Sequence, residues 1–233
     1  MKFISSLLKC RHSLQTIGFI KSHQAFLSFS QQGEDLEIER QLGNKFCGFY
    51  VDIGAFHPIK YSNTCLFYRK GWHGINIEAN PDSFQAFKTI RKRDINLNLA
   101  VSDNREELTY YQFNDPAINT FSLENATRWT QGGNFRITHQ RPVKPVPLSE
   151  VLNRYLPDNQ KIDFMSVDVE GMDLKVLKSN DWSRFRPSLL LVEENICAKK
   201  DLNTSEIYQF MSAQSYELVS VCGITMLFKD QKP

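Results

Sequence analysis

The pattern of apolar and polar residues changes at about residue 46, and this change predicts where the folded domain begins. From there, short runs rich in β-branched and aromatic residues predict buried strands, and amphipathic runs between them predict helices. The predicted strands span residues 48–55, 73–78, 95–101, 107–113, 161–170, 187–195, 216–222 and 224–229. The predicted helices span residues 62–70, 80–91, 149–156, 171–178 and 204–214. This alternation is typical of an α/β domain with a mostly parallel sheet, and the last two strands predict a reversed C-terminal hairpin.

Two segments fall outside this alternation. Residues 1–45 predict an N-terminal helical extension in front of a single domain over residues 46–233. Residues 114–147 are rich in Asn, Thr, Gly and Pro and have no sustained period, so we interpret them as an irregular lid over a ligand site. Aromatic residues in or beside this segment either line a pocket the size of a sugar or anchor the loop: Phe113, Phe121, Trp129 and Phe135.

Acidic residues stand at the ends of several predicted parallel strands. In an open α/β sheet, the ligand crevice lies beyond the carboxyl ends of the strands. Side chains at these ends are therefore the first candidates for a functional site. They are Asp52, Glu78, Asp168, Glu170, Glu193 and Glu194.

The turn after the first strand carries Asp52 and Gly54 but lacks the further glycines that cradle a pyrophosphate, which disfavours a nicotinamide dinucleotide. An acid before a single glycine suits a ligand with a cationic ammonium and sulfonium. Glu78, at the end of the next strand, can accept hydrogen bonds from both ribose hydroxyls. The pair favours a positively charged adenosyl ligand, and the alternative is that each acid forms a turn or caps a helix.

Several blocks together resemble the FkbM family of methyltransferases over about residues 30–194: FSQQGEDL, FYVDIGAFHP, YSNTCLFYRKGWHGINIEANP, LAVSD and IDFMSVDVEGMDLKVL. The resemblance implies a Rossmann-like class I methyltransferase fold and S-adenosyl-L-methionine (SAM) as cofactor. It also implies O-methylation of a hydroxyl on a sugar, polysaccharide or glycosylated metabolite. By position, it implies a cofactor site that includes Asp52, Gly54, Glu78 and Asn80, and an acidic signature at Asp168 and Glu170.

Methyl transfer to a hydroxyl requires the acceptor oxygen to be aligned with the methyl group and to lose its proton, so a base or a metal is expected close by. His57, directly after the cofactor turn, is a candidate general base, and His139 in the irregular segment is a weaker one. Either histidine can instead be a packing or hydrogen-bonding residue. Asp168 and Glu170 are the other catalytic candidates.

Asp168, Glu194 and Asn195 resemble the oxygen ligands with which catechol-type methyltransferases hold Mg²⁺. The alternative is that the second acid caps the following segment and Asp168 only orders the cofactor. Ser62 and Asn63 stand at the start of a predicted helix, so they either bind the cofactor through the helix N-terminus or act as a plain cap. Gln32, Glu34 and Asp35 of the extension either reach over the cofactor or stay in solvent.

The charges are spread along the chain, with 28 Lys and Arg against 26 Asp and Glu, so we expect no nucleic-acid partner. We interpret Arg91 in the basic run 91–93 as the end of a helix, where it complements the helix dipole. A short apolar patch in residues 1–20 predicts an ordinary or surface-lying helix, with membrane association as the alternative. Five cysteines without paired spacing favour a reducing, cytoplasmic compartment.

The sequence therefore predicts a SAM-dependent O-methyltransferase that acts on a carbohydrate or a secondary metabolite. A noncatalytic SAM- or nucleoside-binding regulator is the alternative, in which Asp168 and Glu170 would be structural.

Overall fold

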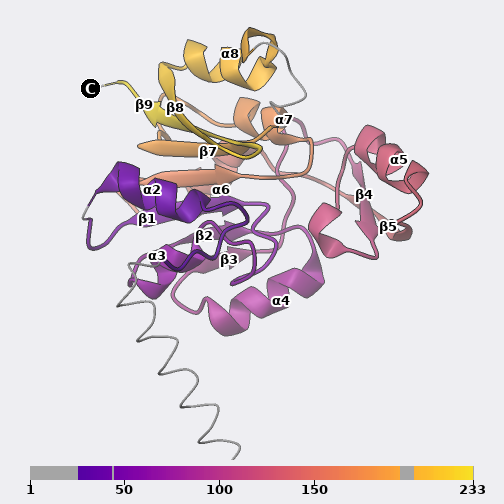
Figure 1. The fold of residues 1–233 in the computed structure, drawn as a ribbon. Helices are drawn as coiled ribbons and strands as arrows, with labels where there is room; N and C mark the ends of the chain where they lie inside the picture. The colour runs from indigo at the N-terminus through magenta and orange to yellow at the C-terminus, as the bar shows by residue number, and fades with distance from the viewer. Residues whose placement is uncertain (1–25, 44, 195–201, 233) are drawn as a thin grey trace, which may run out of the picture.

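Figure 1 shows the computed structural model, which describes residues 26–43, 45–194 and 202–232. Most of the predicted N-terminal extension and Asn195 lie outside the described residues. Within the extension, the described part contains α2 (Glu34–Leu42), which ends at Gly43. In the described parts of the chain, no helix is long and apolar enough to cross a bilayer.

A seven-stranded sheet in the order β3-β2-β1-β6-β7-β9-β8 forms the centre of the domain. Its strands are β1 (Phe49–Ile53), β2 (His73–Ile77), β3 (Ile95–Leu97), β6 (Phe164–Val167), β7 (Leu189–Glu193), β8 (Tyr216–Cys222) and β9 (Thr225–Asp230). The first five of these are parallel, whereas β9 is antiparallel to both β7 and β8. The predicted Rossmann-like fold, with a mostly parallel sheet and a reversed hairpin, is confirmed.

Helices cover both faces of this sheet. They are α3 (Cys65–Arg69), α4 (Pro81–Ile90), α6 (Leu148–Tyr155), α7 (Asp173–Lys178) and α8 (Glu206–Ala213). The helices α6, α7 and α8 contribute Val151, Val176 and Met211 to one buried core, and α2 and α3 contribute Ile38 and Phe67 to the other. Burying a side chain of this size stabilises the fold by about 1.5–3 kcal/mol, so both layers hold the sheet in place.

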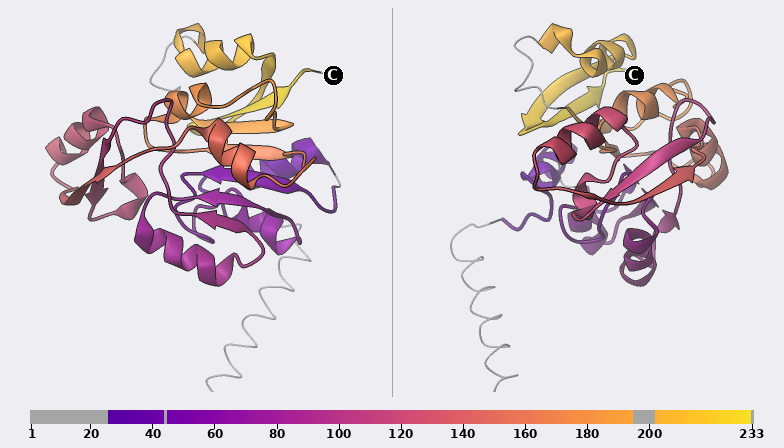
Figure 2. Two further views of the ribbon diagram at one scale, coloured as in Figure 1. Left: turned by 180° about the vertical axis from the view of Figure 1, so that it is seen from behind. Right: turned by 90° about the vertical axis from the view of Figure 1, so that its right-hand side faces the viewer.

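Residues 108–143 form a unit of their own beside the main sheet, with the strands β4 and β5 side by side in the right-hand view of Figure 2. The strands β4 (Leu108–Phe113) and β5 (Ile137–Val143) pair antiparallel, and η1 (Pro116–Ile118) and α5 (Leu123–Gln131) lie between them. We call residues 108–143 the inserted unit. The expectation of an irregular segment over residues 114–147 is therefore wrong, whereas its closure over a ligand stays a prediction.

The elements of the inserted unit were hidden by their polar composition. Most residues of β5 are exposed, and Pro142 interrupts the run, so the strand shows no apolar alternation. The helix α5 buries only Ala126 fully, although Ser122 caps it by accepting the N–H of Asn125 at 3.2 Å. Short, exposed elements of this kind contain few of the apolar residues by which a core helix or strand is identified.

Strand register brings the predicted acidic residues into one row. Ile53 pairs with Ile77 on one side and with Val167 on the other, and Val167 pairs with Val192. These four side chains all lie in the core beneath α6, α7 and α8. Because successive side chains of a strand point to opposite faces, the next residue of each strand belongs to the α2 and α3 face. The row across that face is Glu78, Gly54, Asp168 and Glu193.

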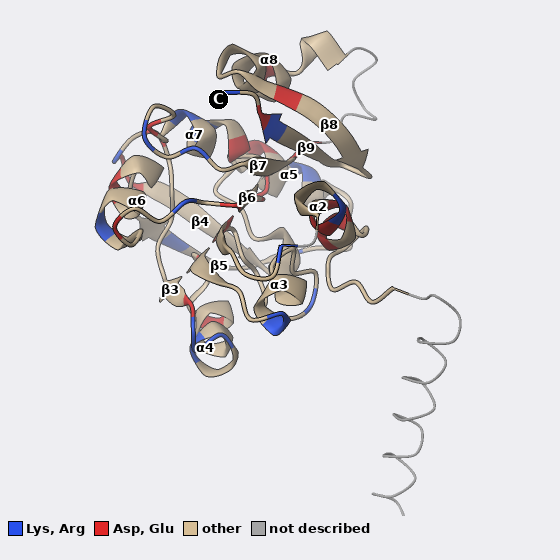
Figure 3. Cartoon of the chain, turned by 90° about the vertical axis from the view of Figure 1, so that its left-hand side faces the viewer, with Lys and Arg blue, Asp and Glu red and all other residues tan. Residues whose placement is uncertain are grey.

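Figure 3 shows that Lys and Arg are distributed over several helices and loops, together with Asp and Glu. The expectation that nucleic acid is not a partner stays a prediction.

Candidate active site

A cavity of about 180 Å³ lies at the carboxyl ends of the parallel strands. Its wall combines the ends of β1, β2, β6 and β7 with residues of the inserted unit. The predicted site residues that line it are Asp52, Gly54, Asn63, Glu78, Asp168 and Glu170. Residues far apart in the sequence thus share one concave surface, and we call it the main cavity.

Gly54 brings the backbone after β1 against the backbone after β6. Its φ of 79° lies in the left-handed region, which favours glycine, and its N–H donates to the carbonyl oxygen of Ile77 at 3.0 Å. A Cβ atom at this position would overlap the carbonyl oxygen of Asp168. Glycine is therefore needed where the chain leaves β1 and passes against the end of β6.

Two backbone groups fix the carboxylate of Glu78. One oxygen accepts the N–H of Phe56 at 2.7 Å, and the other accepts the N–H of Asn80 at 2.6 Å. Burial raises the pKa of Glu78 to about 7, although the two hydrogen bonds oppose the increase. Each oxygen keeps further lone-pair capacity for a ligand in the main cavity.

Asp52 is buried beside this turn, with 5% of its surface exposed, and its Oδ2 accepts the hydroxyl of Thr64 at 2.9 Å. Burial raises the pKa of Asp52 to about 6, whereas the Thr64 hydrogen bond and the charge of Arg91 lower it. Asp52 is therefore mostly ionised at neutral pH. Its neighbour on β6 is Ser166, whose Oγ accepts a hydrogen bond from Asn63 at 2.9 Å.

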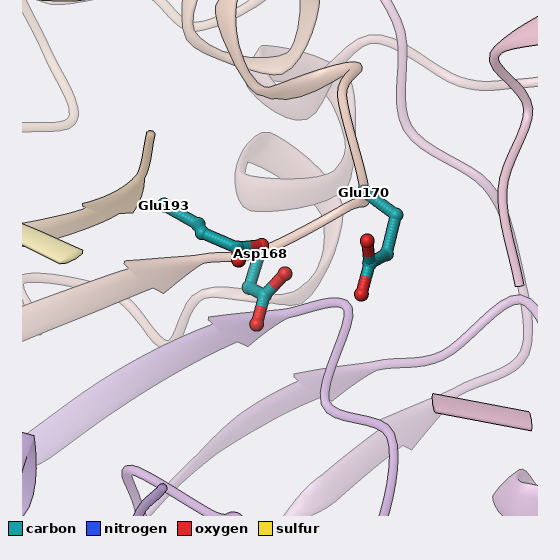
Figure 4. A group of neighbouring side chains, drawn as sticks. All are labelled: Asp168, Glu170 and Glu193. Atoms are coloured by element: carbon teal, nitrogen blue, oxygen red, sulfur yellow. The ribbon is translucent and has the colours of Figure 1, made fainter. Parts of the chain in front are cut away.

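Three carboxylates meet at the ends of β6 and β7, and Figure 4 shows Glu193 extending toward Asp168 while Glu170 approaches from the loop after β6. One ligand oxygen from each lies within 4.8 Å of those of the others. Oδ1 of Asp168 is buried and has no hydrogen-bond partner. Burial and the charge of Asp168 raise the pKa of Glu170 to about 8 and hold that of Glu193 far above its usual value. Such a group needs a shared proton or a cation.

The inserted unit is bonded directly to the loop that carries Glu170. Thr120 Oγ1 and Asn125 Nδ2 both donate to the carbonyl oxygen of Glu170, at 2.8 and 2.7 Å. Gly171 follows at a φ of 96°, and a Cβ there would overlap the side chain of Asn125. The position of the inserted unit is therefore coupled to that of the carboxylate cluster.

A second hollow of about 300 Å³ adjoins the main cavity and shares Glu170 and Glu193 with it. We call it the side hollow. Arg128 and Asn125 of α5 contribute hydrogen-bond donors to its wall, and Glu206 of α8 contributes an acceptor. The remaining lining residues are Gly171, Asp173, Leu174, Glu194 and Ile207.

Of the two consecutive acids at the end of β7, Glu193 rather than Glu194 joins Asp168. Glu194 instead accepts a hydrogen bond from the hydroxyl of Ser205 and lines the side hollow. The row set by strand register explains this difference, since Glu193 is the residue level with Asp168. The tentative set of Asp168, Glu194 and Asn195 thus differs from the cluster observed, and Asn195 lies outside the described residues.

The candidate histidines do not belong to the wall of either hollow. Nδ1 of His57 accepts the N–H groups of Ile59 at 3.1 Å and Lys60 at 2.9 Å, so the imidazole shapes its own turn. His139 is exposed on β5. The structure gives His57 the hydrogen-bonding role that was the alternative to a general base.

Two other predicted cofactor residues have structural roles. Asn80 caps α4 by accepting the N–H of Asp82 at 3.1 Å, and it does not line the main cavity. Ser62 is buried away from the cavity, and Thr64 rather than Ser62 stands at the start of α3. Of the predicted Ser62 and Asn63 pair, only Asn63 reaches the main cavity.

Sequence reasoning missed several residues of the main cavity. Gln31 lines it, whereas Gln32 packs against Gly223 in the turn between β8 and β9. Glu34 lines only a smaller adjoining hollow. Asp35 accepts the hydroxyl of Ser28 at 2.6 Å and so shapes the extension from within. The sequence pattern does not indicate which of the two consecutive glutamines, Gln31 or Gln32, lines the main cavity.

The aromatic residues of the inserted unit have different roles, since some line the main cavity and others anchor the unit. Phe121 lines the main cavity together with Tyr110, which the sequence reasoning missed. Phe113 and Trp129 instead pack edge to face, with ring centroids 5.7 Å apart, and hold α5 against β4. Phe135 lines neither hollow.

The comparisons with known proteins give one family match. A family model described as the methyltransferase FkbM domain matches residues 52–218, from Asp52 at the site to β8. No curated protein sequence matches the chain. One similar solved structure is described as "a putative O-methyltransferase from Klebsiella pneumoniae", with 11% sequence identity, a TM-score of 0.45, and coverage of 88% of this chain and 83% of that chain.

We predict that Gly54→Ala abolishes ligand binding in the main cavity, because the added Cβ collides with the backbone of Asp168. Gly71→Ala is the matched control, since Gly71 also has a positive φ but has open space around it. The control should lose only about 1–2 kcal/mol of unfolding free energy, the cost of the left-handed conformation. Thermal unfolding and SAM calorimetry check both variants. Wild-type SAM affinity in folded Gly54→Ala would contradict the prediction.

Proposed function

The chain belongs to the FkbM family of methyltransferases, and we propose that it transfers the methyl group of SAM to a hydroxyl of a sugar, polysaccharide or glycosylated metabolite. The observation that carries this proposal is the continuity of two hollows. The main cavity has the acids suited to SAM, and the side hollow meets it at Glu170 and Glu193. A cofactor in one and an acceptor in the other would meet at these carboxylates.

In this proposal, SAM spans the main cavity from Glu78 to Asp168. The carboxylate of Glu78 is held by backbone N–H groups and accepts the two ribose hydroxyls. Asp52 faces the ammonium group at the amino-acid end of the cofactor, directly or through water. Tyr110 and Phe121 offer ring faces on the inserted-unit side, where the adenine can pack.

The acceptor occupies the side hollow. Its donors, Arg128 and Asn125, and its carboxylate acceptor, Glu206, can hydrogen-bond to a ligand rich in hydroxyl groups. Leu174 and Ile207 supply apolar surface, which suits the faces of a sugar ring. A hydroxyl that points from this hollow toward the main cavity reaches Glu170.

Glu170 is the proposed general base. Its pKa is raised to about 8 by burial and by Asp168, so it lies close to a neutral working pH, where a base is most effective. The loop that carries it is fixed through its backbone by Thr120 and Asn125, which orients the carboxylate. His57 is not required in this arrangement.

Asp168, Glu170 and Glu193 also suit Mg²⁺, because they offer hard oxygen ligands and because Oδ1 of Asp168 is buried without a partner. When bound, Mg²⁺ would compensate the clustered charge and lower the pKa of the acceptor hydroxyl, so a carboxylate base with a raised pKa would be less necessary. We propose this set in place of Glu194 and Asn195 as the partners of Asp168.

The cofactor role of Glu78 is tested by calorimetry with SAM. Glu78→Gln should weaken SAM binding by about 10-fold to 100-fold, because a charge-assisted hydrogen bond contributes about 1.5–3 kcal/mol. Asp82→Asn, an exposed change on the adjoining helix α4, should leave the affinity unchanged. If folded Glu78→Gln binds SAM as tightly as the wild type, Glu78 is not a cofactor residue.

The metal set is tested by activity after chelation. We expect turnover to S-adenosylhomocysteine to be lost after chelation and restored by Mg²⁺, and Glu193→Gln to need about tenfold or more Mg²⁺ because it loses an anionic ligand. Glu194→Gln, the neighbouring control, should respond as the wild type does. A larger effect in Glu194→Gln would favour the set with Asn195, and full activity after exhaustive chelation would exclude a metal requirement.

The acceptor site is tested with a panel of simple glycosides. Arg128→Ala should raise the KM of any glycoside that is methylated by about 5-fold to 10-fold, as expected for one lost hydrogen bond of about 1 kcal/mol, while SAM affinity stays unchanged. Glu124→Ala is the control on the same helix, since Glu124 is exposed and lies outside the side hollow. Equal effects of the two variants would place the acceptor elsewhere.

A further inference from the structure

We infer that Arg91 is a positioning residue that acts through Thr64 to keep the Asp52 carboxylate ionised and oriented for the positively charged end of SAM. This inference rests on the proposed role of Asp52 in the cofactor site. Arg91 stands at the end of α4, as the sequence predicts, but its side chain has 0% exposure and is bound within the protein.

Arg91 follows the last turn of α4 and extends into the core beneath the main cavity. Its Nε donates to the carbonyl oxygen of Pro58 at 2.8 Å, and its Nη2 donates to the hydroxyls of Ser62 at 3.0 Å and Thr64 at 3.3 Å. These acceptors all belong to the segment between β1 and α3. One guanidinium thus fixes the segment that borders the main cavity at Asn63.

The chemistry of the guanidinium sets the direction of the hydrogen bonds. Arginine can only donate, so the oxygen of Thr64 accepts from Arg91, and its single proton is free to point elsewhere. Oδ2 of Asp52 lies 2.9 Å from that hydroxyl, and an ionised carboxylate can only accept. The sequence of donors therefore runs from Arg91 through Thr64 to Asp52 and favours the ionised carboxylate.

Asp94 holds the charge of Arg91 in place. The two groups form a fully buried ion pair at 3.6 Å. Asp94 in turn accepts hydrogen bonds from the hydroxyl of Tyr50 at 2.6 Å, from Asn76 at 2.9 Å and from the N–H of Gly74 at 3.0 Å. Because β1 and β2 supply these donors, the sheet holds Asp94 in place, and Asp94 in turn holds the guanidinium of Arg91.

Asp52 needs this support because its surroundings otherwise favour protonation. Burial raises its pKa to about 6, and two further carboxylates act in the same direction, Asp168 after β6 and Asp94 after α4. Glu78 after β2 also interacts with Asp52 electrostatically. Thr64 and the charge of Arg91 are the influences that lower the pKa of Asp52. Without them, the pKa of Asp52 would be higher still, and less of the carboxylate would carry the charge that a cationic cofactor requires.

The test is the ratio of SAM affinity to adenosine affinity as a function of pH, measured by calorimetry with a chelator present. Adenosine lacks the ammonium and the sulfonium, so the ratio reports the charged end of SAM and cancels any titration of Glu78 at the ribose. The range of about pH 5 to about pH 7.5 stays below the ordinary pKa of an amino group. In the wild type, the ratio should be constant at neutral pH and fall as the pH drops below about 6.

Thr64→Val removes the donor to Asp52 and leaves the volume of the side chain nearly unchanged. The fall in the ratio should then begin about one pH unit higher, as expected for the loss of a charge-assisted hydrogen bond to the ionised form. Arg91→Lys keeps the charge beside Asp94 but cannot serve the same acceptors together, so its profile should move in the same direction. Thr64→Ser, which keeps the hydroxyl, should restore the wild-type profile.

Asp52→Asn separates the two claims. If Asp52→Asn has a low ratio that no longer depends on pH, the cofactor role of Asp52 is supported. If Thr64→Val and Arg91→Lys then have the same pH profile as the wild type, the proposed action of Arg91 through Thr64 on Asp52 is overturned. A shift in Thr64→Val without one in Arg91→Lys overturns the role of Arg91. If Asp52→Asn retains the wild-type ratio and its pH dependence, the assignment of Asp52 to the cofactor site fails instead.

Discussion

The parallel register at the carboxyl edge of the sheet is the constraint on which the site depends. Pairing of Ile53, Ile77, Val167 and Val192 fixes which residue follows on each strand, and so it aligns Glu78, Asp168 and Glu193 across one face. Gly54 occupies the remaining place in the row, where a side chain would collide with the neighbouring strand. The result is a concave edge with carboxylates on either side of a gap, into which a ligand can fit.

Carboxylates gathered in this way are costly to bury, because each ion loses its hydration and several repel one another. The pKa values of Asp52, Glu78 and Glu170 are raised because burial and neighbouring carboxylates disfavour the ionised form. Cations relieve this cost, and the protein already supplies one, Arg91, whose charge lowers the pKa of Asp52. A sulfonium cofactor, and Mg²⁺ at the carboxylate cluster, would relieve it from the cavity side. The same electrostatics thus connects the fold, the choice of cofactor and the chemistry of methyl transfer.

Strand ends, the reversed hairpin and the Asp52 turn could be predicted because each leaves a local signal: an apolar run, a change of period, or an acid before a glycine. What could not be predicted depends on contacts distant in sequence. The choice of Glu193 over Glu194 follows from register with β6, and the burial of Arg91 follows from acceptors that the segment between β1 and α3 brings to it. Residues 114–147 were expected to lack regular structure because α5 and β5 are short, mostly exposed and poor in apolar residues.

The most direct test of the account is a crystal structure of the protein with S-adenosylhomocysteine bound. The account predicts that both ribose hydroxyls lie against the carboxylate of Glu78, that the amino-acid end lies toward Asp52, and that the sulfur faces Glu170 and the side hollow. A ligand bound with its ribose away from Glu78, or outside the main cavity, would contradict the claim that the row of carboxylates at the sheet edge forms the cofactor site.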